Sequence, residues 1–169
     1  MTQPRLQGQA RVFGDDVNTD YIISSIRKRE SLDPLVLRHY LFECIDPGFA
    51  ASVTPGDLLV AGRNFGCGSA MEVAVTALLG AGIAAVLARS FSRTYYRNAI
   101  NNGLLPIICD TSHIQAGDRL SISAGPEMAV HNETTGDVLL PETLPPIMLD
   151  ILAAGGLVPY MRQRGGFTT

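Results

Sequence analysis

The feature that most constrains the fold of this chain is an alternation of apolar runs and helical patterns between residues 58 and 109. The elements expected from this pattern are strands at 58–61, 83–88 and 104–109 and helices at 70–79 and 92–102. Gly80, Gly82 and Gly103 fall at or just beyond the helices, where glycine is a common helix end. Because strands and helices alternate at this spacing, we expect right-handed crossovers and a mainly parallel sheet.

The pattern changes after Asp110 to short segments separated by glycine, proline and an Asn-Glu-Thr-Thr-Gly turn. Antiparallel strands are expected at 119–123, 128–131 and 137–140, followed by helices at 147–154 and 157–164. No internal repeat or low-complexity linker interrupts the chain. We therefore expect one α/β domain over residues 1–169, with a partly parallel sheet and an antiparallel C-terminal part.

A glycine-rich loop, Asn-Phe-Gly-Cys-Gly-Ser at 64–69, joins the first expected strand to the first expected helix. It places Ser69 at a helix N-terminus, where unpaired N–H groups and the helix dipole favour an anion. Gly66 and Gly68 allow left-handed backbone angles and a close approach to a ligand. A purely structural alternative exists, because Ser69 and Glu72 have the spacing of a capping box. The short pattern alone leaves both interpretations open.

Composition narrows the class of protein. The chain has 169 residues, of which 46% are hydrophobic and 17% charged, as in a globular protein with a real core. A net charge of −3 argues against nucleic-acid binding, which needs clustered Lys and Arg. Residues 1–16 contain no long apolar run and no segment resembles a membrane span, so a cytoplasmic protein is expected.

Cysteines and histidines give no sign of a metal site on this chain. They are scattered at Cys44, Cys67, Cys109, His39, His113 and His131. The cysteines lack Cys-x-x-Cys spacing and are odd in number, which favours reduced thiols. We expect the histidines on the surface or in loops, and any iron–sulfur cluster to be ligated elsewhere.

Two blocks of sequence resemble a known family. Residues 61–106 read AGRNFGCGSAMEVAVTALLGAGIAAVLARSFSRTYYRNAINNGLLP, and residues 14–23 read GDDVNTDYII. Together they resemble the swivel domain of the aconitase superfamily, and most closely its separate small subunits of the 3-isopropylmalate dehydratase (isopropylmalate isomerase) type. The order of the blocks and the chain length also match, so the resemblance covers most of the chain. It implies a layered β/β/α fold.

The resemblance implies a lyase that dehydrates and rehydrates a small hydroxy-di- or tricarboxylic acid, with leucine biosynthesis as the pathway of the nearest relatives. In such enzymes a large subunit carries a [4Fe-4S] cluster, and the small subunit closes over it as a heterodimer partner. The family's serine base corresponds to Ser69, and a stabilised serine anion suits a glycine-rich loop. Gly66, Cys67 and Gly68 would supply the backbone around it.

Further site residues follow from the same resemblance. Thr19 and Asp20 correspond to polar groups near the family's cleft, and Asn64 stands just before the glycines of the loop, where it can orient the loop or contact substrate. The alternative for Asp16, Thr19 and Asp20 is a cluster of turn and cap residues. Aromatic residues of the 92–102 helix are expected to pack in the core or against the partner.

The chain departs from the family where Ala70 and Met71 replace a usual Ser-Arg pair that helps to bind a substrate carboxylate. Loss of such a charged contact costs about 2–5 kcal/mol when it is buried. In one account, the substrate is a different acid, such as a substituted malate, maleate or citraconate. In a second, Arg27 or Arg29 replaces the missing cation, unless the basic loop at 24–30 is simply solvated. In a third, the chain is a non-catalytic swivel-fold module that binds a partner.

Overall fold

The computed structural model describes residues 5–125 and 127–165 and contains one seven-stranded mixed sheet in the order β4-β3-β2-β1-β5-β6-β7. The strands are β1 (Arg5–Val12), β2 (Leu58–Val60), β3 (Ala85–Ala88), β4 (Leu105–Ile108), β5 (Arg119–Ser123), β6 (Ala129–Asn132) and β7 (Val138–Leu139). The helices are α1 (Thr19–Ile22), α2 (Ser25–Glu30), α3 (Pro34–Leu37), α4 (Phe49–Ser52), α5 (Val73–Gly80), α6 (Arg93–Asn102), α7 (Pro146–Ala153) and α8 (Leu157–Arg164), with a 3₁₀ turn η1 (Arg38–Tyr40).

The parallel and antiparallel parts of the sheet meet at β1. This strand pairs in parallel with β2, where Ala10 lies opposite Leu58, and antiparallel with β5, where Arg5 lies opposite Ser123. Strands β2, β3 and β4 pair in parallel, and β5, β6 and β7 pair antiparallel. The partly parallel sheet with an antiparallel C-terminal part that the sequence predicted is confirmed.

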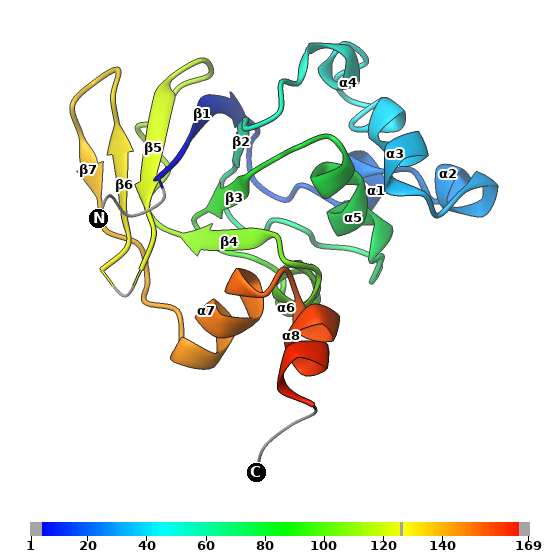
Figure 1. Ribbon diagram of the computed structural model, residues 1–169. Coiled ribbons are helices and arrows are strands. Elements are labelled where there is room, and N and C mark those ends of the chain that lie inside the picture. The colour runs from blue at the N-terminus through cyan, green and yellow to red at the C-terminus, as the bar shows by residue number, and fades with distance from the viewer. Residues whose placement is uncertain (1–4, 126, 166–169) are drawn as a thin grey trace.

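Strand side chains alternate between two cores, which explains the layered architecture. Leu59 and Val86 point into a core shared with α1, α3 and α5. Their neighbours Leu58 and Leu87 point the other way and pack with Leu120 and other residues of the antiparallel strands. Figure 1 shows α1 to α5 on one side of the parallel strands and β5 to β7 on the other. The sheet therefore curls over one core while helices cover the second.

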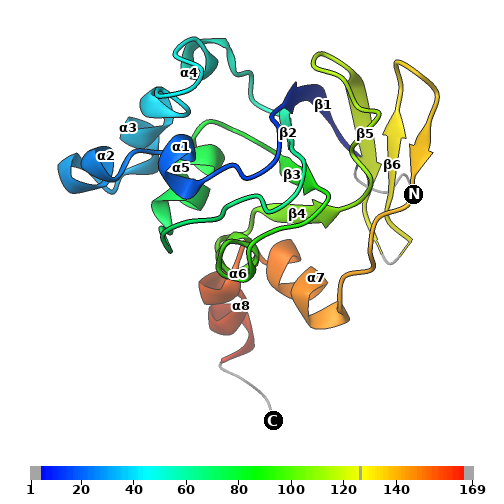
Figure 2. The ribbon, with the colours of Figure 1, turned by 180° about the vertical axis from the view of Figure 1, so that it is seen from behind.

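A third, smaller core joins the last helices to α6. It contains Ile100, Leu144, Ile151 and Tyr160. Figure 2 shows α6, α7 and α8 grouped beneath β4. This packing fixes α6, which also contributes to the site described below.

Strand β1 was not anticipated, although it lies at the centre of the sheet. Its side chains include several exposed polar residues, and only Ala10 is fully buried. The strand lacks the β-branched residues that mark a central strand, apart from Val12, and it contains Gly8, where a Cβ would overlap the backbone carbonyl of Gly56. The glycine is thus required by close chain packing, a cause that local sequence does not reveal.

The other differences are local. Within the segment 24–30, expected as a loop, Ser25–Glu30 form α2, and the N-cap residue Ser24 accepts a bond from the backbone of Ile26. His131, expected on a surface or in a loop, is half-buried in β6. Within residues 5–125 and 127–165, no helix is long and apolar enough to cross a bilayer.

Candidate active site

The two sequence blocks that were singled out lie side by side and are joined by backbone hydrogen bonds. The bonds run from Asp16 N to Arg63 O, from Gly66 N to Val17 O and from Thr19 N to Cys67 O, each 2.8 Å. Thr19 adds a side-chain bond, because its Oγ1 donates to the carbonyl oxygen of Ser69 at 2.8 Å. The glycine-rich loop is therefore held along its length by the Thr-Asp block.

The start of α6 holds the same loop from another side. Ser92 Oγ donates to Gly66 O at 2.7 Å, and Ser92 N donates to Phe65 O at 2.9 Å. Phe65 N in turn donates to Ser90 O at 3.0 Å. Since both edges are bonded, the loop at 64–69 is a fixed part of the fold.

Both loop glycines adopt the left-handed angles expected from the sequence, with φ of +77° at Gly66 and +92° at Gly68. A Cβ at Gly66 would overlap the ring of Tyr95, and one at Gly68 would lie 2.5 Å from Asn18 Oδ1. Tyr95 is buried, and its hydroxyl donates to Ala74 O at 3.1 Å. Burial also raises the pKa of the Tyr95 hydroxyl, so this group stays protonated as a donor.

The capping-box interpretation of Ser69 is wrong. Helix α5 begins at Val73, not at Ala70, and its N-cap residue is Glu72, without a side-chain capping bond. The left-handed Gly68 and the bond from Thr19 to the Ser69 carbonyl keep the intervening residues out of the helix. Ser69 therefore lies outside the first helical turn, and its exposed hydroxyl has no hydrogen-bond partner among the described residues.

Backbone donors are nevertheless present around Ser69. Within the described parts of the chain, the N–H groups of Gly68, Ser69 and Ala70 donate to no protein acceptor. All three residues are exposed. The loop itself therefore offers backbone donors of the kind that the sequence predicted at a helix end.

Ser69 lines a small pocket of about 120 Å³. The lining residues are Thr19, Gly66, Gly68, Ser69, Ala70, Met71, Ser92, Thr94, Tyr95 and Asn98. Five of the predicted site residues meet here: Thr19, Gly66, Gly68, Ser69 and Ala70. The lining contains no charged side chain, so this pocket presents hydroxyl, amide and apolar groups only.

Met71 contributes to this neutral lining from the core. Its side chain is 4% exposed and packs with the apolar residues between the sheet and α1, α3 and α5. The position that the family resemblance assigns to an arginine is therefore occupied by an uncharged thioether, which cannot form an ion pair with a carboxylate.

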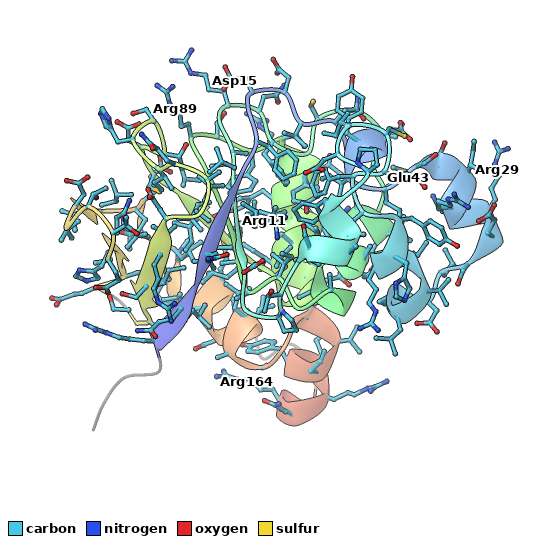
Figure 3. All side chains as sticks on the ribbon, turned by 90° about the horizontal axis from the view of Figure 1, so that it is seen from above. Arg11, Asp15, Arg29, Glu43, Arg89 and Arg164 are labelled. Carbon is cyan, nitrogen blue, oxygen red and sulfur yellow. The ribbon has the colours of Figure 1, made fainter. Side chains whose placement is uncertain are left out.

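Arg27 and Arg29 do not reach the pocket. The Arg27 guanidinium donates to Glu43 at 2.9 and 3.0 Å and to Glu30 at 3.0 Å, and it stacks 3.9 Å from the centre of the Tyr40 ring. Its bonds to Glu43 and then Glu30 raise the pKa of Arg27 above its usual value. Arg29 is exposed on α2 and points away from the protein (Figure 3). Arg27 therefore acts as a structural anchor.

The remaining predicted residues, Asn64, Cys67 and Asp20, lie in the loop or near it and do not line the pocket. Asn64 has a φ of +57°, and its Nδ2 donates to Asp16 Oδ1 at 2.8 Å, which ties the two blocks together. Asp20 accepts a bond from Ser25 N at 3.3 Å near the start of α2. Cys67 is partly buried; desolvation, followed by the nearby Asp16 charge, raises the pKa of its thiol. Of these three residues, Asn64 joins the loop to the other block through its side chain, whereas the Asp20 side chain bonds within its own segment.

Sequence reasoning missed the contribution of α6 to the pocket. Thr94 and Asn98 are four residues apart, so both side chains lie on one face of the helix. Asn98 is half-buried, and its side-chain amide has no hydrogen-bond partner among the described residues. The spacing was visible in the sequence, but only the fold shows which helical face meets Ser69.

No candidate metal centre occurs in the described parts of the chain, 5–125 and 127–165, where no three His, Cys, Asp or Glu side chains come together. The donor set present here does not fit an iron–sulfur cluster, which takes several thiolates.

Comparison with known proteins places this geometry in a family. The family model described as aconitase C-terminal domain matches residues 42–112. The chain is 44% identical over 162 residues to the 3-isopropylmalate dehydratase small subunit of Moorella thermoacetica, covering 94% of this chain and 96% of that one. The crystal structure of 3-isopropylmalate dehydratase (leuD) from Methanocaldococcus jannaschii superposes with a TM-score of 0.91 at 44% identity, over 96% of each chain.

Two relatives with other names are equally similar. The methanogen homoaconitase small subunit of Methanocaldococcus jannaschii is 45% identical over 159 residues, covering 94% of this chain and 92% of that one. The isopropylmalate/citramalate isomerase small subunit of the same organism is 42% identical over 161 residues, covering 94% and 95%. Overall similarity therefore does not distinguish among the activities that these names describe.

Proposed function

Because this chain belongs to the family of 3-isopropylmalate dehydratase small subunits within the aconitase superfamily, we propose that it forms a hydro-lyase with a large subunit and that Ser69 is the general base. The observation that carries this proposal is the Ser69 hydroxyl, exposed and unbonded within the described residues, in a pocket built by both family blocks. A hydroxyl used for capping would have been unavailable for proton transfer.

In the proposed reaction Ser69 transfers one proton. Dehydration removes a proton from the carbon next to the hydroxyl-bearing carbon, hydroxide leaves, and a double bond forms. Ser69 Oγ accepts that proton and returns it on rehydration. A serine hydroxyl is a poor base unless its anion is stabilised, and the N–H groups at 68–70, which have no acceptor among the described residues, are suited to do this.

The large subunit completes the site. This chain closes over the reacting part of the substrate, while the [4Fe-4S] cluster implied by the family resemblance is assigned to the large subunit. The ligand set of the small chain supports that division, because its described residues bring no three candidate ligands together. We expect the complex in the cytoplasm.

The neutral pocket indicates the class of substrate. A carboxylate placed against Ala70 and Met71 would be desolvated without a cation, which is unfavourable. We therefore favour a hydroxy-dicarboxylic acid whose apolar substituent faces this pocket, such as an alkyl-substituted malate. Its carboxylates are then bound by the large subunit.

Anaerobic co-expression with a cluster-bearing large subunit of the same family tests the proposal. The complex is assayed with alkyl-substituted malates and with tricarboxylic hydroxy-acids by following the ultraviolet absorbance of the unsaturated product. We expect turnover of an alkyl-substituted malate that Ser69→Ala abolishes. Turnover of a tricarboxylic acid alone would refute the substrate class.

A second candidate function is favoured by Ala70 and Met71, which lack the family's usual polar pair. In that case the chain is a non-catalytic module that binds the large subunit. An assembled, cluster-loaded complex without turnover of any acid in the panel would select this candidate.

A further inference from the structure

A groove separate from the Ser69 pocket lies on another flank of α6. Its volume is about 510 Å³, and it is lined chiefly by apolar side chains of α6, β4 and α7: Tyr96, Ile100, Ile108, Ile147, Met148 and Ile151. Ile147 at the start of α7 is 48% exposed. A concave apolar surface of this size on a folded protein is typical of an interaction site.

Two arginines mark one edge of this groove. Arg93 and Arg97 are four residues apart on α6, line the groove and are exposed. Neither lies within 4.0 Å of a carboxylate oxygen in the described parts of the chain. The whole chain carries a net charge of −3, so the positive charge at this edge is local and opposite in sign to the net charge of the protein.

We propose that this groove receives a segment of the large subunit that places apolar side chains in the groove and carboxylates against Arg93 and Arg97. This inference rests on the proposed function, which requires a large subunit. Helix α6 links the two surfaces, since Thr94 and Asn98 line the Ser69 pocket within one turn of the groove arginines. A partner that closes over Ser69 therefore comes close to the groove arginines.

The charges favour a different chain over a second copy of this one. A two-fold symmetric dimer brings the same patch of both copies together. The groove lining carries Arg93 and Arg97 but no Asp or Glu, so self-association would oppose like charges. A partner segment with apolar and acidic side chains can fill the groove with the former and pair with the two arginines through the latter.

The test measures binding of purified large subunit to the full-length chain by biolayer interferometry at two salt concentrations. Arg93→Glu/Arg97→Glu is compared with Arg38→Glu/Arg119→Glu, which reverses two exposed charges elsewhere. We expect the groove variant to raise Kd at least tenfold and to lose most of the salt dependence, while the control binds as wild type. Thermal unfolding verifies that both variants fold.

A second pair tests the apolar component. Ile147→Lys is compared with Val158→Lys, which introduces the same charge at an exposed position of α8. Only Ile147→Lys should weaken binding. Unchanged binding of both groove variants would overturn the proposal, as would wild-type chain that fails to bind the large subunit.

Two controls separate this inference from the proposed function. The first control is sedimentation of the chain alone, with and without a long-chain fatty acid. If the groove variants change only self-association, the groove belongs to a second copy; if they change only the effect of the fatty acid, it belongs to a lipid. Ser69→Ala should bind the large subunit normally. If Ser69→Ala also retains turnover, the base assignment fails while the docking site stands.

Discussion

Replacement of Thr19 by valine tests whether the bond to the Ser69 carbonyl positions the base. Thr19 is 2% exposed, and its Oγ1 donates to Ser69 O at 2.8 Å. Valine keeps the shape and removes the donor. Because Ser69 is exposed, water can replace the lost donor, so the expected loss of stability is about 0.5–1.5 kcal/mol. For a chain of this size that lowers Tm by roughly 1–6 °C.

The expected effect on catalysis is larger. Without the Thr19 bond, the stretch between Gly68 and α5 is free to move, and misplacement of a reacting group by about 1 Å can lower the rate about 100-fold. We expect kcat of the assembled complex to fall about 10- to 100-fold, at a temperature well below Tm. Large-subunit binding should be unchanged.

Thr111 provides a matched control. Its Oγ1 donates to Ala61 O at 2.6 Å, and both residues are buried, at 6% and 2% exposure, away from the Ser69 pocket. Thr111→Val leaves a buried carbonyl unpaired, at a cost of about 1–3 kcal/mol. The control should thus lose more stability and less activity than Thr19→Val. The reasoning is refuted if Thr111→Val lowers kcat as much, or if Thr19→Val leaves it intact.

Three further changes test other parts of the structure. Gly66→Ala places a Cβ against the Tyr95 ring at a left-handed φ, so it should lower Tm and kcat together; an unchanged melting curve would show that the loop adapts. Asn98→Ala removes an amide with no partner among the described residues, so it should leave Tm unchanged and raise KM about 2- to 12-fold, whereas a lower Tm with normal KM would indicate a structural role. Burial, followed by the Asp110 charge, raises the pKa of Cys109 to about 11, above that of the unfolded thiol. Because the unfolded chain then loses this proton first, the free energy of unfolding should fall by up to about 2 kcal/mol as pH rises from about 9 to 11. Urea unfolding of Cys109→Ala should show a smaller fall, and an equal fall would contradict this origin.

Much of the fold was predictable because its elements are bounded by strong local signals. Strand β5 and helix α8 begin and end where the sequence indicated, and α6 begins after Ser92 and ends at a left-handed Gly103 as its glycine suggested. Strand β1 was missed because its glycine and exposed polar residues reflect contacts with distant segments. Local pattern does not encode such contacts.

The site was predictable in part. Both blocks were recognised, but the start of α5 was misplaced because the Thr19 bond that overrides the capping box spans 50 residues. Arg27 was a candidate for the missing substrate-binding cation, but its guanidinium pairs with Glu43. Local sequence pattern does not reveal this pairing, because the two residues belong to different segments. Asn98 was overlooked because helical spacing identifies a face but not what that face meets.

Exchange of substrate hydrogen with solvent deuterium tests the central claim, that Ser69 is the general base, most directly. In the assembled complex, wild type should catalyse incorporation of deuterium from D₂O at the carbon that is deprotonated. Ser69→Ala should bind the large subunit normally while exchange and turnover fall about 10²- to 10⁴-fold, the usual contribution of a general base. Exchange within tenfold of wild type in Ser69→Ala would contradict the account.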